Sequence, residues 1–230
     1  MEKQVSRRDF LKVSVTAGAM LTAGGLLADG RNMAYAGDVQ PVQLLKPQIA
    51  TGNVMLKVLE KRCSSREFGP DPLPVGVLSN LLWAAFGINR PDGKRTAPSG
   101  RNRQEIDIYV ATPEGLYLYD AKVNVLQPIS AGDIRGLTGT QDYVKQAAVN
   151  LVYVADTSKM GEMTPEYKAF VIGADTGCIA ENVYLYCAAE GLATVVRALI
   201  DKPALAKAMK LRAEQEITLA QSVGYPKKKD

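Results

Sequence analysis

Two arginines and a serine alternate between residues 62 and 66, and their side chains could together bind an anion. If the chain is extended there, Arg62, Ser64 and Arg66 point to the same side of the backbone. Two guanidinium groups and a hydroxyl can then hold one phosphate through charge-assisted hydrogen bonds. The alternative is an exposed basic helix end that favours the negative pole of the helix dipole, and taken alone that alternative is the stronger.

A second polar group lies between Arg95 and Gln104, immediately before an apolar segment. Its hydroxyl, amide and guanidinium groups suit the edges of a heteroaromatic ring and a sugar-like chain, although a solvated loop would have the same composition. A third group begins at Asn182, inside an apolar segment, and continues from Gly191 to Leu199. Burying an unpaired amide is costly, so we expect Asn182 to have a hydrogen-bond partner in the core.

Composition limits the chemistry that the polypeptide can perform by itself. The 230 residues include no histidine, which excludes Ser-His-Asp and Cys-His catalysis and every metal site that needs imidazole. The three cysteines form no C-x-x-C pair, so no metal site is predicted. Neither a G-x-G-x-x-G nor a P-loop motif occurs, so neither Rossmann nor P-loop phosphate binding is supported. Redox or bond-breaking chemistry must therefore come from a bound organic cofactor, or from carboxylate, hydroxyl, lysine or thiol groups.

Hydrophobic periodicity predicts one α+β domain in which helices and strands alternate without internal repeats. Helices are expected from residue 53 to about 61, from 74 to about 86, over 167–191 and over 203–210, and residues 89–103 form a polar loop. Strands are expected over 106–110, 115–120, 123–128, 149–154 and 217–223, while 194–200 could be loop or strand. The apolar run at 149–154 is typical of a strand buried on both faces. Residues 179–189 predict a buried central helix.

The cysteines at 63, 178 and 187 are expected to be buried free thiols. If Cys178 and Cys187 share a helix, the nine residues between them turn through about 900° and place the two on opposite faces. Their Cα atoms are then farther apart than the ~7 Å that a disulfide tolerates. This pair therefore cannot form a bridge.

The first 36 residues predict a twin-arginine (Tat) export signal. Arg7 and Arg8 precede a weakly apolar stretch, and Ala34-Tyr35-Ala36 has the form of a cleavage site; the alternative is a chance arginine pair before a buried helix. Residues 37–50 would then be an extended leader, 51–230 the folded domain, the Tat machinery a partner, and the periplasm or outer face of the cell the location. Beyond residue 36 the chain has 23 Lys and Arg against 21 Asp and Glu, a balance that does not indicate a nucleic-acid partner.

In their order along the chain, these polar groups resemble the nitroreductase family of flavoproteins over residues 50–226. The resemblance rests on Arg62–Phe68, on Pro98, Ser99, Asn102 and Gln104 before a strand, on Asn182 with Gly191–Leu192, and on Val223–Pro226. Residues 81–88, 95–99 and 115–120 are especially similar to the branch related to azoline-peptide dehydrogenases. Residues 99–101 depart from that branch, in which this segment is smaller and less charged.

This resemblance implies an α+β sandwich with an antiparallel or mixed sheet flanked by helices, an intertwined homodimer, and FMN at the subunit interface. It implies that Arg62, Ser64 and Arg66 hold the FMN phosphate and ribityl chain, and that Asn102 lies near the pyrimidine edge of the ring. The other implied contacts are Pro98, Ser99 and Gln104 along the flavin, the backbone of Arg197, Ala198 and Leu199 near flavin N5, and Lys227 or a neighbouring lysine at the phosphate.

The implied activity is ping-pong hydride transfer through the flavin, to or from a small organic substrate. Family members generally use NAD(P)H, but no substantial nicotinamide pool is expected outside the cytoplasm. One alternative is an exported dehydrogenase or oxidase of a small or peptide-derived substrate, with quinone or oxygen as the acceptor. Another is a non-catalytic exported binding protein on the same fold.

Overall fold

The computed structural model describes residues 42–47, 49 and 52–228 of the chain. Its contacts divide the chain into two units, Met1–Lys46 and Pro47–Asp230. Of the first unit, residues 42–46 are described, and they form no helix or strand. The predicted signal peptide and half of the predicted leader lie outside the described residues. All the elements below belong to the second unit.

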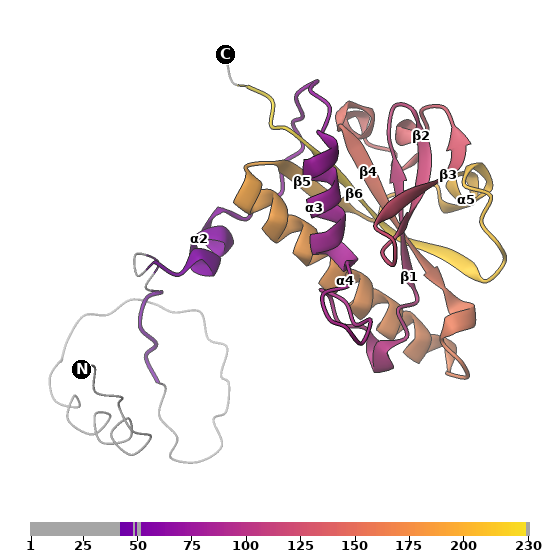
Figure 1. Cartoon of the computed structure of the whole chain (residues 1–230), viewed down its shortest axis with the longest axis horizontal. Helices are drawn as coiled ribbons and strands as arrows, with labels where there is room; N and C mark the ends of the chain where they lie inside the picture. Colours follow the sequence, from indigo (N-terminus) through magenta and orange to yellow (C-terminus); the bar gives the residue numbers. More distant parts are fainter. Residues whose placement is uncertain (1–41, 48, 50–51, 229–230) are drawn as a thin grey trace, which may run out of the picture. The chain divides into compact units, whose positions relative to one another are not determined.

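Within the described part of the chain, the second unit is built on a six-stranded antiparallel sheet (Figure 1). In spatial order its strands are β3 Val125–Ala131, β2 Gly115–Asp120, β1 Ile106–Ala111, β4 Val149–Asp156, β6 Gln215–Gly224 and β5 Ala193–Arg197. Every strand predicted from the sequence is present, and the ambiguous segment 194–200 supplies most of β5. All eight residues of β4 are buried, which confirms the interpretation of its apolar run.

Among the described residues, four α-helices accompany the sheet: α2 Val54–Lys61, α3 Val75–Phe86, α4 Pro165–Glu190 and α5 Lys202–Ala208. Short 3-10 turns lie at η2 Gly100–Asn102, η3 Arg135–Leu137, η4 Asp142–Gln146 and η5 Thr157–Lys159. Local side chains set the helix ends. Asn53 Oδ1 accepts from the Met55 N–H at 3.0 Å, and the side chain of Thr164 caps α4, which Gly191 ends in a left-handed conformation.

Two apolar layers form the core, one on each face of the sheet. Helices α3 and α4 pack side by side on one face, where Leu81 and Ile179 join Ile108 of β1 (Figure 1). Helix α5 covers the opposite face, with Leu205 in the same cluster as Val152 of β4. Because strand side chains alternate between faces, β1 and β4 contribute to both layers. Helix α4 and the central strands therefore form a packed frame for the segments attached to them.

Helix α4 is buried along one stripe, whereas the sequence predicted a buried central helix. Ile179, Val183 and Cys187 lie in the core, but Gly177 and Glu181 are exposed. The outer stripe consists mostly of small residues, so composition alone did not distinguish it from a buried surface. In the described part of the chain, no helix combines the length and apolar character that a bilayer crossing requires.

The prediction of three buried thiols is wrong for two of them. All three cysteines are free, but only Cys187 is buried, and burial raises the pKa of its thiol to about 12. Cys178 lies on the outer stripe of α4, on the opposite side from Cys187, as helical geometry requires. Cys63 is exposed because it belongs to an extended segment at the surface.

Candidate functional site

The basic segment at residues 62–67 is extended and attached to other parts of the fold at two points. Near its start, the Ser65 N–H donates to the carbonyl oxygen of Thr194 in β5 at 2.9 Å. Near its end, the Lys227 N–H donates to the carbonyl oxygen of Glu67 at 3.2 Å. The fold therefore places the C-terminal lysine beside the basic segment, from which it is separated by 160 residues of chain.

Two of the three predicted phosphate-binding residues of this segment contact the same side chain of α4. The Cζ atom of Arg62 lies 5.3 Å from the ring centre of Tyr184, and Ser64 Oγ lies 2.8 Å from Tyr184 Oη. Arg66 is exposed, two residues farther along the extended chain. The structure thus brings Arg62 and Ser64 together at Tyr184, whereas the contact of Lys227 is between its backbone and Glu67, at the far end of the segment.

The second predicted group, at residues 95–104, is a hydrogen-bonded loop. Gln104 is its centre: its N–H donates to Ser99 Oγ at 3.1 Å, and its Nε2 donates to Asn102 Oδ1 at 3.0 Å. Arg95 Nε donates to Gln104 Oε1 at 2.7 Å. Pro98 is exposed at the start of this turn. Three predicted flavin-lining residues, Ser99, Asn102 and Gln104, are therefore held in one arrangement.

The backbone of this loop is unusual, because three of its non-glycine residues are left-handed. Arg101 and Asn102 both have φ 54°, and Gln104 has φ 51°. Such conformations cost about 1–3 kcal/mol each and occur preferentially at binding and catalytic sites. The Gly100 N–H anchors the turn to α4 by donating to Asp175 Oδ2 at 2.7 Å.

A buried carboxyl pair lies beneath the loop. Glu105 is fully buried and Asp175 nearly so, and neither carboxylate oxygen of Glu105 has a hydrogen-bond partner among the described residues. Burial is the main cause that raises the pKa of Glu105 to about 7, and the neighbouring Asp175 adds to it, while Arg103 acts in the opposite direction. Glu105 therefore changes its charge close to neutral pH.

The third predicted group divides between the interior and the surface. Ala198 and Leu199 are exposed where the chain leaves β5, whereas the Arg197 side chain is buried. Arg197 donates to the carbonyl oxygen of Thr138 at 2.6 Å and to Asn150 Oδ1 at 2.9 Å, and burial lowers the pKa of its guanidinium to about 10. The Arg197 side chain is thus a structural anchor, and an exposed backbone follows it.

The basic segment and the polar loop attach to opposite flanks of α4. The segment contacts Tyr184 and the loop is bonded to Asp175, nine residues earlier. Nine residues of α-helix rise about 13.5 Å and turn through about 900°, so these two side chains point in opposite directions from the helix axis. Within one chain, the two predicted halves of the site therefore do not face each other.

The linings of two cavities are consistent with this separation of the two predicted halves of the site. A cavity of about 600 Å³ is lined by Phe68, Gly191, Tyr225 and Lys227, and a groove of about 370 Å³ is lined by α2, α3 and α4, with Asn182 on its wall. Asn182 Nδ2 donates to the carbonyl oxygen of Ala85 at 3.3 Å, which confirms the prediction that this amide has a partner. Neither cavity is lined by Arg62, Asn102 or Ala198.

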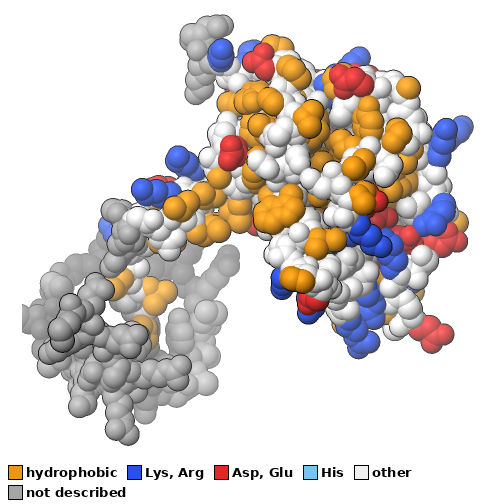
Figure 2. Space-filling model, viewed as in Figure 1, with side chains coloured by type: hydrophobic (Ala, Val, Ile, Leu, Met, Phe, Trp, Pro, Cys, Tyr) orange, Lys and Arg blue, Asp and Glu red, His pale blue; other side chains and the backbone are white. Residues whose placement is uncertain are grey.

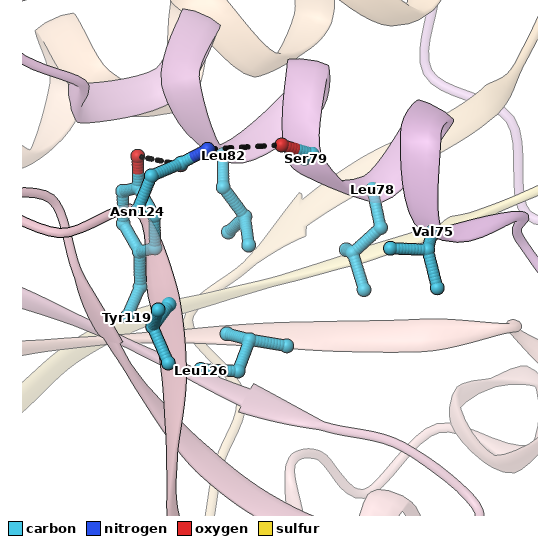
Figure 3. A pocket seen from close by; sticks show the side chains of 8 residues that line it. Val75, Leu78, Ser79, Leu82, Tyr119, Asn124 and Leu126 are labelled. Carbon is cyan, nitrogen blue, oxygen red and sulfur yellow. Dashed lines mark hydrogen bonds between the residues drawn. The ribbon is translucent and has the colours of Figure 1, made fainter.

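A smaller cavity of about 200 Å³ lies between α3 and the β2–β3 hairpin (Figure 3). Leu78, Leu82 and Leu126 give it an apolar lining. At one end Tyr119 Oη donates to Asn124 Oδ1 at 3.1 Å, and Asn124 Nδ2 donates to Ser79 Oγ at 3.2 Å. Its polar groups are thus bonded to one another, and none of the predicted site residues lines it.

Sequence reasoning missed three residues on which the candidate site depends. Tyr184 contacts Arg62 and Ser64, Asp175 accepts from the Gly100 N–H, and Glu105 is buried directly after Gln104, yet none belongs to a recognisable motif. The available signals were an acidic residue within the apolar part of α4 and a glutamate directly before β1. Their roles became visible only when the fold paired them with residues far away in the sequence.

Comparison with known proteins gives one consistent result. The family model described as the nitroreductase family matches residues 59–225. The nitroreductase candidate MJ1384 of Methanocaldococcus jannaschii is 29% identical over 170 residues, which cover 69% of this chain and 84% of that protein. A crystal structure of a nitroreductase candidate from Ralstonia eutropha JMP134 is 43% identical, with a TM-score of 0.74, and the match covers 81% of this chain and 89% of that one.

A more distant structure shares the fold. It belongs to the Escherichia coli microcin synthetase McbBCD complex with truncated pro-MccB17 bound, and it has a TM-score of 0.65 at 16% identity. The match covers 99% of this chain and 85% of that chain. At this identity the likeness concerns the architecture alone.

Proposed function

The chain belongs to the nitroreductase family of oxidoreductases, and we propose on that basis that it binds FMN and transfers hydride in a ping-pong reaction with small organic substrates. The observation that supports this proposal is that Arg62 and Ser64 both contact Tyr184, while the Lys227 backbone is bonded to Glu67 at the end of the same basic segment. The family resemblance implies a phosphate site at this segment, and an anion would suit these side chains.

The donor set of this region fits a phosphate group. Arg62, Arg66 and Lys227 are cations with at least partly exposed side chains, and Ser64 adds a neutral hydroxyl donor. An FMN phosphate presents oxyanion acceptors only, so each of these groups can donate to it, and the bonds are charge-assisted. The backbone attachments of residues 65 and 67 hold the segment extended, which keeps alternate side chains on one side.

The loop before β1 fits the edge of a flavin ring. Asn102 and Gln104 carry amides, and Ser99 carries a hydroxyl, so the loop offers both donors and acceptors to ring carbonyl and N–H groups. Pro98 adds an apolar surface beside them. The exposed backbone at Ala198 and Leu199 supplies main-chain groups that can bond to the central ring.

In this proposal the cofactor carries the redox chemistry, because bound FMN accepts a hydride from one substrate and delivers it to another. The chain itself binds the phosphate, orients the ring and offers hydrogen bonds to its polar edge. A chain without histidine can perform these tasks, since none of them requires a titrating imidazole.

The separation of the two half-sites leads us to propose a homodimer with composite sites. A second copy can present its Asn102 loop to the basic segment of the first, since within one chain these two groups attach to α4 at points about 13.5 Å apart along its axis. Figure 2 shows hydrophobic side chains gathered on the face where α3 and α4 lie. Trp83, Tyr167 and Phe170 are about half exposed or more, and a second copy would cover apolar surface of this kind.

The electron donor in this proposal depends on the compartment in which the protein works. If the predicted Tat signal directs the protein out of the cytoplasm, a donor other than NAD(P)H is expected. Anaerobic mixing with NADH, and separately with candidate small or peptide-derived substrates, identifies the donor by bleaching of the flavin absorbance. A reaction with such a substrate but not with NADH would favour the dehydrogenase or oxidase alternative.

Removing the basic side chains tests the proposed cofactor site. We expect Arg62→Ala combined with Arg66→Ala to raise the Kd for FMN by about 100-fold or more, because two charge-assisted bonds are lost. Fluorescence titration with FMN measures this affinity, and circular dichroism checks that the variant is folded.

The matched control is Lys57→Ala combined with Lys61→Ala, which removes the same charge from exposed positions on α2. This control should bind FMN like the wild type. Equal affinity in the arginine variant and the control would contradict the proposed site. A wild-type protein that is colourless and rejects added FMN would instead support the non-catalytic alternative.

A further inference from the structure

Tyr184 connects three parts of the structure that meet at the basic segment. Its ring lies under the guanidinium of Arg62, and its hydroxyl is 2.8 Å from Ser64 Oγ. The same hydroxyl accepts from the Val196 N–H of β5 at 2.9 Å. Tyr184 is itself buried, with 7% of its surface exposed. One side chain of α4 therefore contacts both the proposed phosphate-binding residues and the strand that leads to Ala198.

The protons of these groups limit which atom can donate in each hydrogen bond of the cluster. A backbone N–H can only donate, so Tyr184 Oη is the acceptor toward Val196. The phenol proton remains free and can be donated to Ser64 Oγ, which leaves the proton of Ser64 to donate outward, because Ser64 lies at the surface. A chain of bonds that runs from Val196 through Tyr184 to Ser64 presents a donor to any group bound there. An oxyanion is the ligand that accepts such a bond without offering one in return.

The position of β5 explains why this arrangement is available. It is the last strand on its side of the sheet and pairs only with β6 among the described strands. An edge strand has backbone groups without a partner strand, and the hydroxyl of Tyr184 satisfies one of them. The tyrosine thereby fixes Ser64 relative to Val196 of β5, which lies two residues before Ala198.

We propose that Tyr184 is a positioning residue for the phosphate of a bound flavin mononucleotide: its hydroxyl orients Ser64 and its ring holds Arg62. The inference rests on the proposed function, since it requires that the basic segment bind a phosphate. It differs from a packing role in one respect. A packing residue supports every part of a ligand, whereas the side chains that Tyr184 contacts in the proposed site, Arg62 and Ser64, both belong to the phosphate end.

Comparing FMN with riboflavin tests this difference, because riboflavin has the same ring and ribityl chain without the phosphate. We expect Tyr184→Phe, which removes the hydroxyl and keeps the ring, to raise the Kd for FMN by about 5- to 20-fold. The Kd for riboflavin should change by less than about 2-fold. Tyr186→Phe is the matched control, because Tyr186 lies two residues along α4 and bonds the carbonyl oxygen of Val77 at 3.2 Å. It should leave both affinities unchanged.

A double-mutant cycle with Ser64→Ala gives a second measurement, in which circular dichroism first checks that the variants carrying Tyr184→Phe are folded; Ser64 itself is exposed. If Tyr184 acts through Ser64, the double variant should bind FMN no more weakly than Ser64→Ala alone. Additive losses would overturn the proposal, and so would an equal loss of FMN and riboflavin affinity in Tyr184→Phe. A wild type that binds neither flavin would overturn the proposed function as well, whereas unchanged FMN binding in Tyr184→Phe would overturn this inference alone.

Discussion

Glu105 and Asp175 form a buried carboxyl pair under the loop that holds Ser99, Asn102 and Gln104. The pKa of Glu105 lies at about 7 in the folded chain, against an ordinary value of 4.5. Folding therefore favours the protonated carboxyl. This contribution to the free energy of unfolding is fully present below pH 4.5, falls as the pH rises between these two values, and is lost above about pH 7.

Replacing the titrating group should remove this pH dependence. We expect the wild type to lose at least about 1 kcal/mol more stability than Glu105→Gln between pH 5 and pH 8, because the amide cannot ionise. Urea unfolding at the two pH values measures the difference, with Glu190→Gln on the exposed end of α4 as the control. The same loss of stability in Glu105→Gln and the wild type would show that Glu105 does not titrate in this range.

At the residue level, the sequence offered candidates for binding a ligand but no sign of the residues that contact them in the fold. Arginines and a serine at alternate positions are compatible with an anion site, but taken alone they favour an exposed basic helix end, and only the order of the polar groups along the chain pointed to a phosphate. Ser64 and its partner Tyr184 are 120 residues apart, and no local pattern joins them. The burial of the Arg197 side chain was equally hidden, since its partners Thr138 and Asn150 belong to distant segments.

Among the elements, those with strong local signals were predictable. The cap at Asn53, the continuous apolar run of β4 and the glycine after α4 each depend on neighbouring residues, so the sequence contains the information. Segment 194–200 stayed ambiguous because β5 is a five-residue edge strand, and pairing with β6 rather than local pattern decides its conformation. The outer stripe of α4 was mistaken for core because small residues can occupy either environment.

Gly191 tests how far local backbone conformation fixes the end of α4. Its φ of 71° is left-handed, and a Cβ there would meet no atom within 4 Å, so Gly191→Ala changes the backbone preference without a clash. We expect a loss of about 1–2 kcal/mol in urea unfolding. Gly76→Ala in α3 is the control, because that position is also open but has no positive φ. It should be neutral or stabilising by up to about 1 kcal/mol; equal effects would contradict the assigned cause.

For the molecule as a whole, the arrangement around α4 has the largest functional consequence. The basic segment and the polar loop are each hydrogen-bonded to α4, yet they attach to opposite flanks of this helix. The order of residues indicated both groups as candidate site residues. It contained no information on how far apart they lie within one folded chain. Under the proposed function, a second copy of the chain completes the site.

A crystal structure of the purified protein saturated with FMN tests the proposed composite site most directly. We expect a dimer in which the phosphate lies within about 3 Å of Ser64 Oγ and beside Arg62 of one subunit, while Asn102 of the other subunit borders the flavin ring. Three results would contradict the proposed site. The flavin could lie entirely within one subunit, its phosphate could lie away from the basic segment, or crystals grown with saturating FMN could contain no flavin.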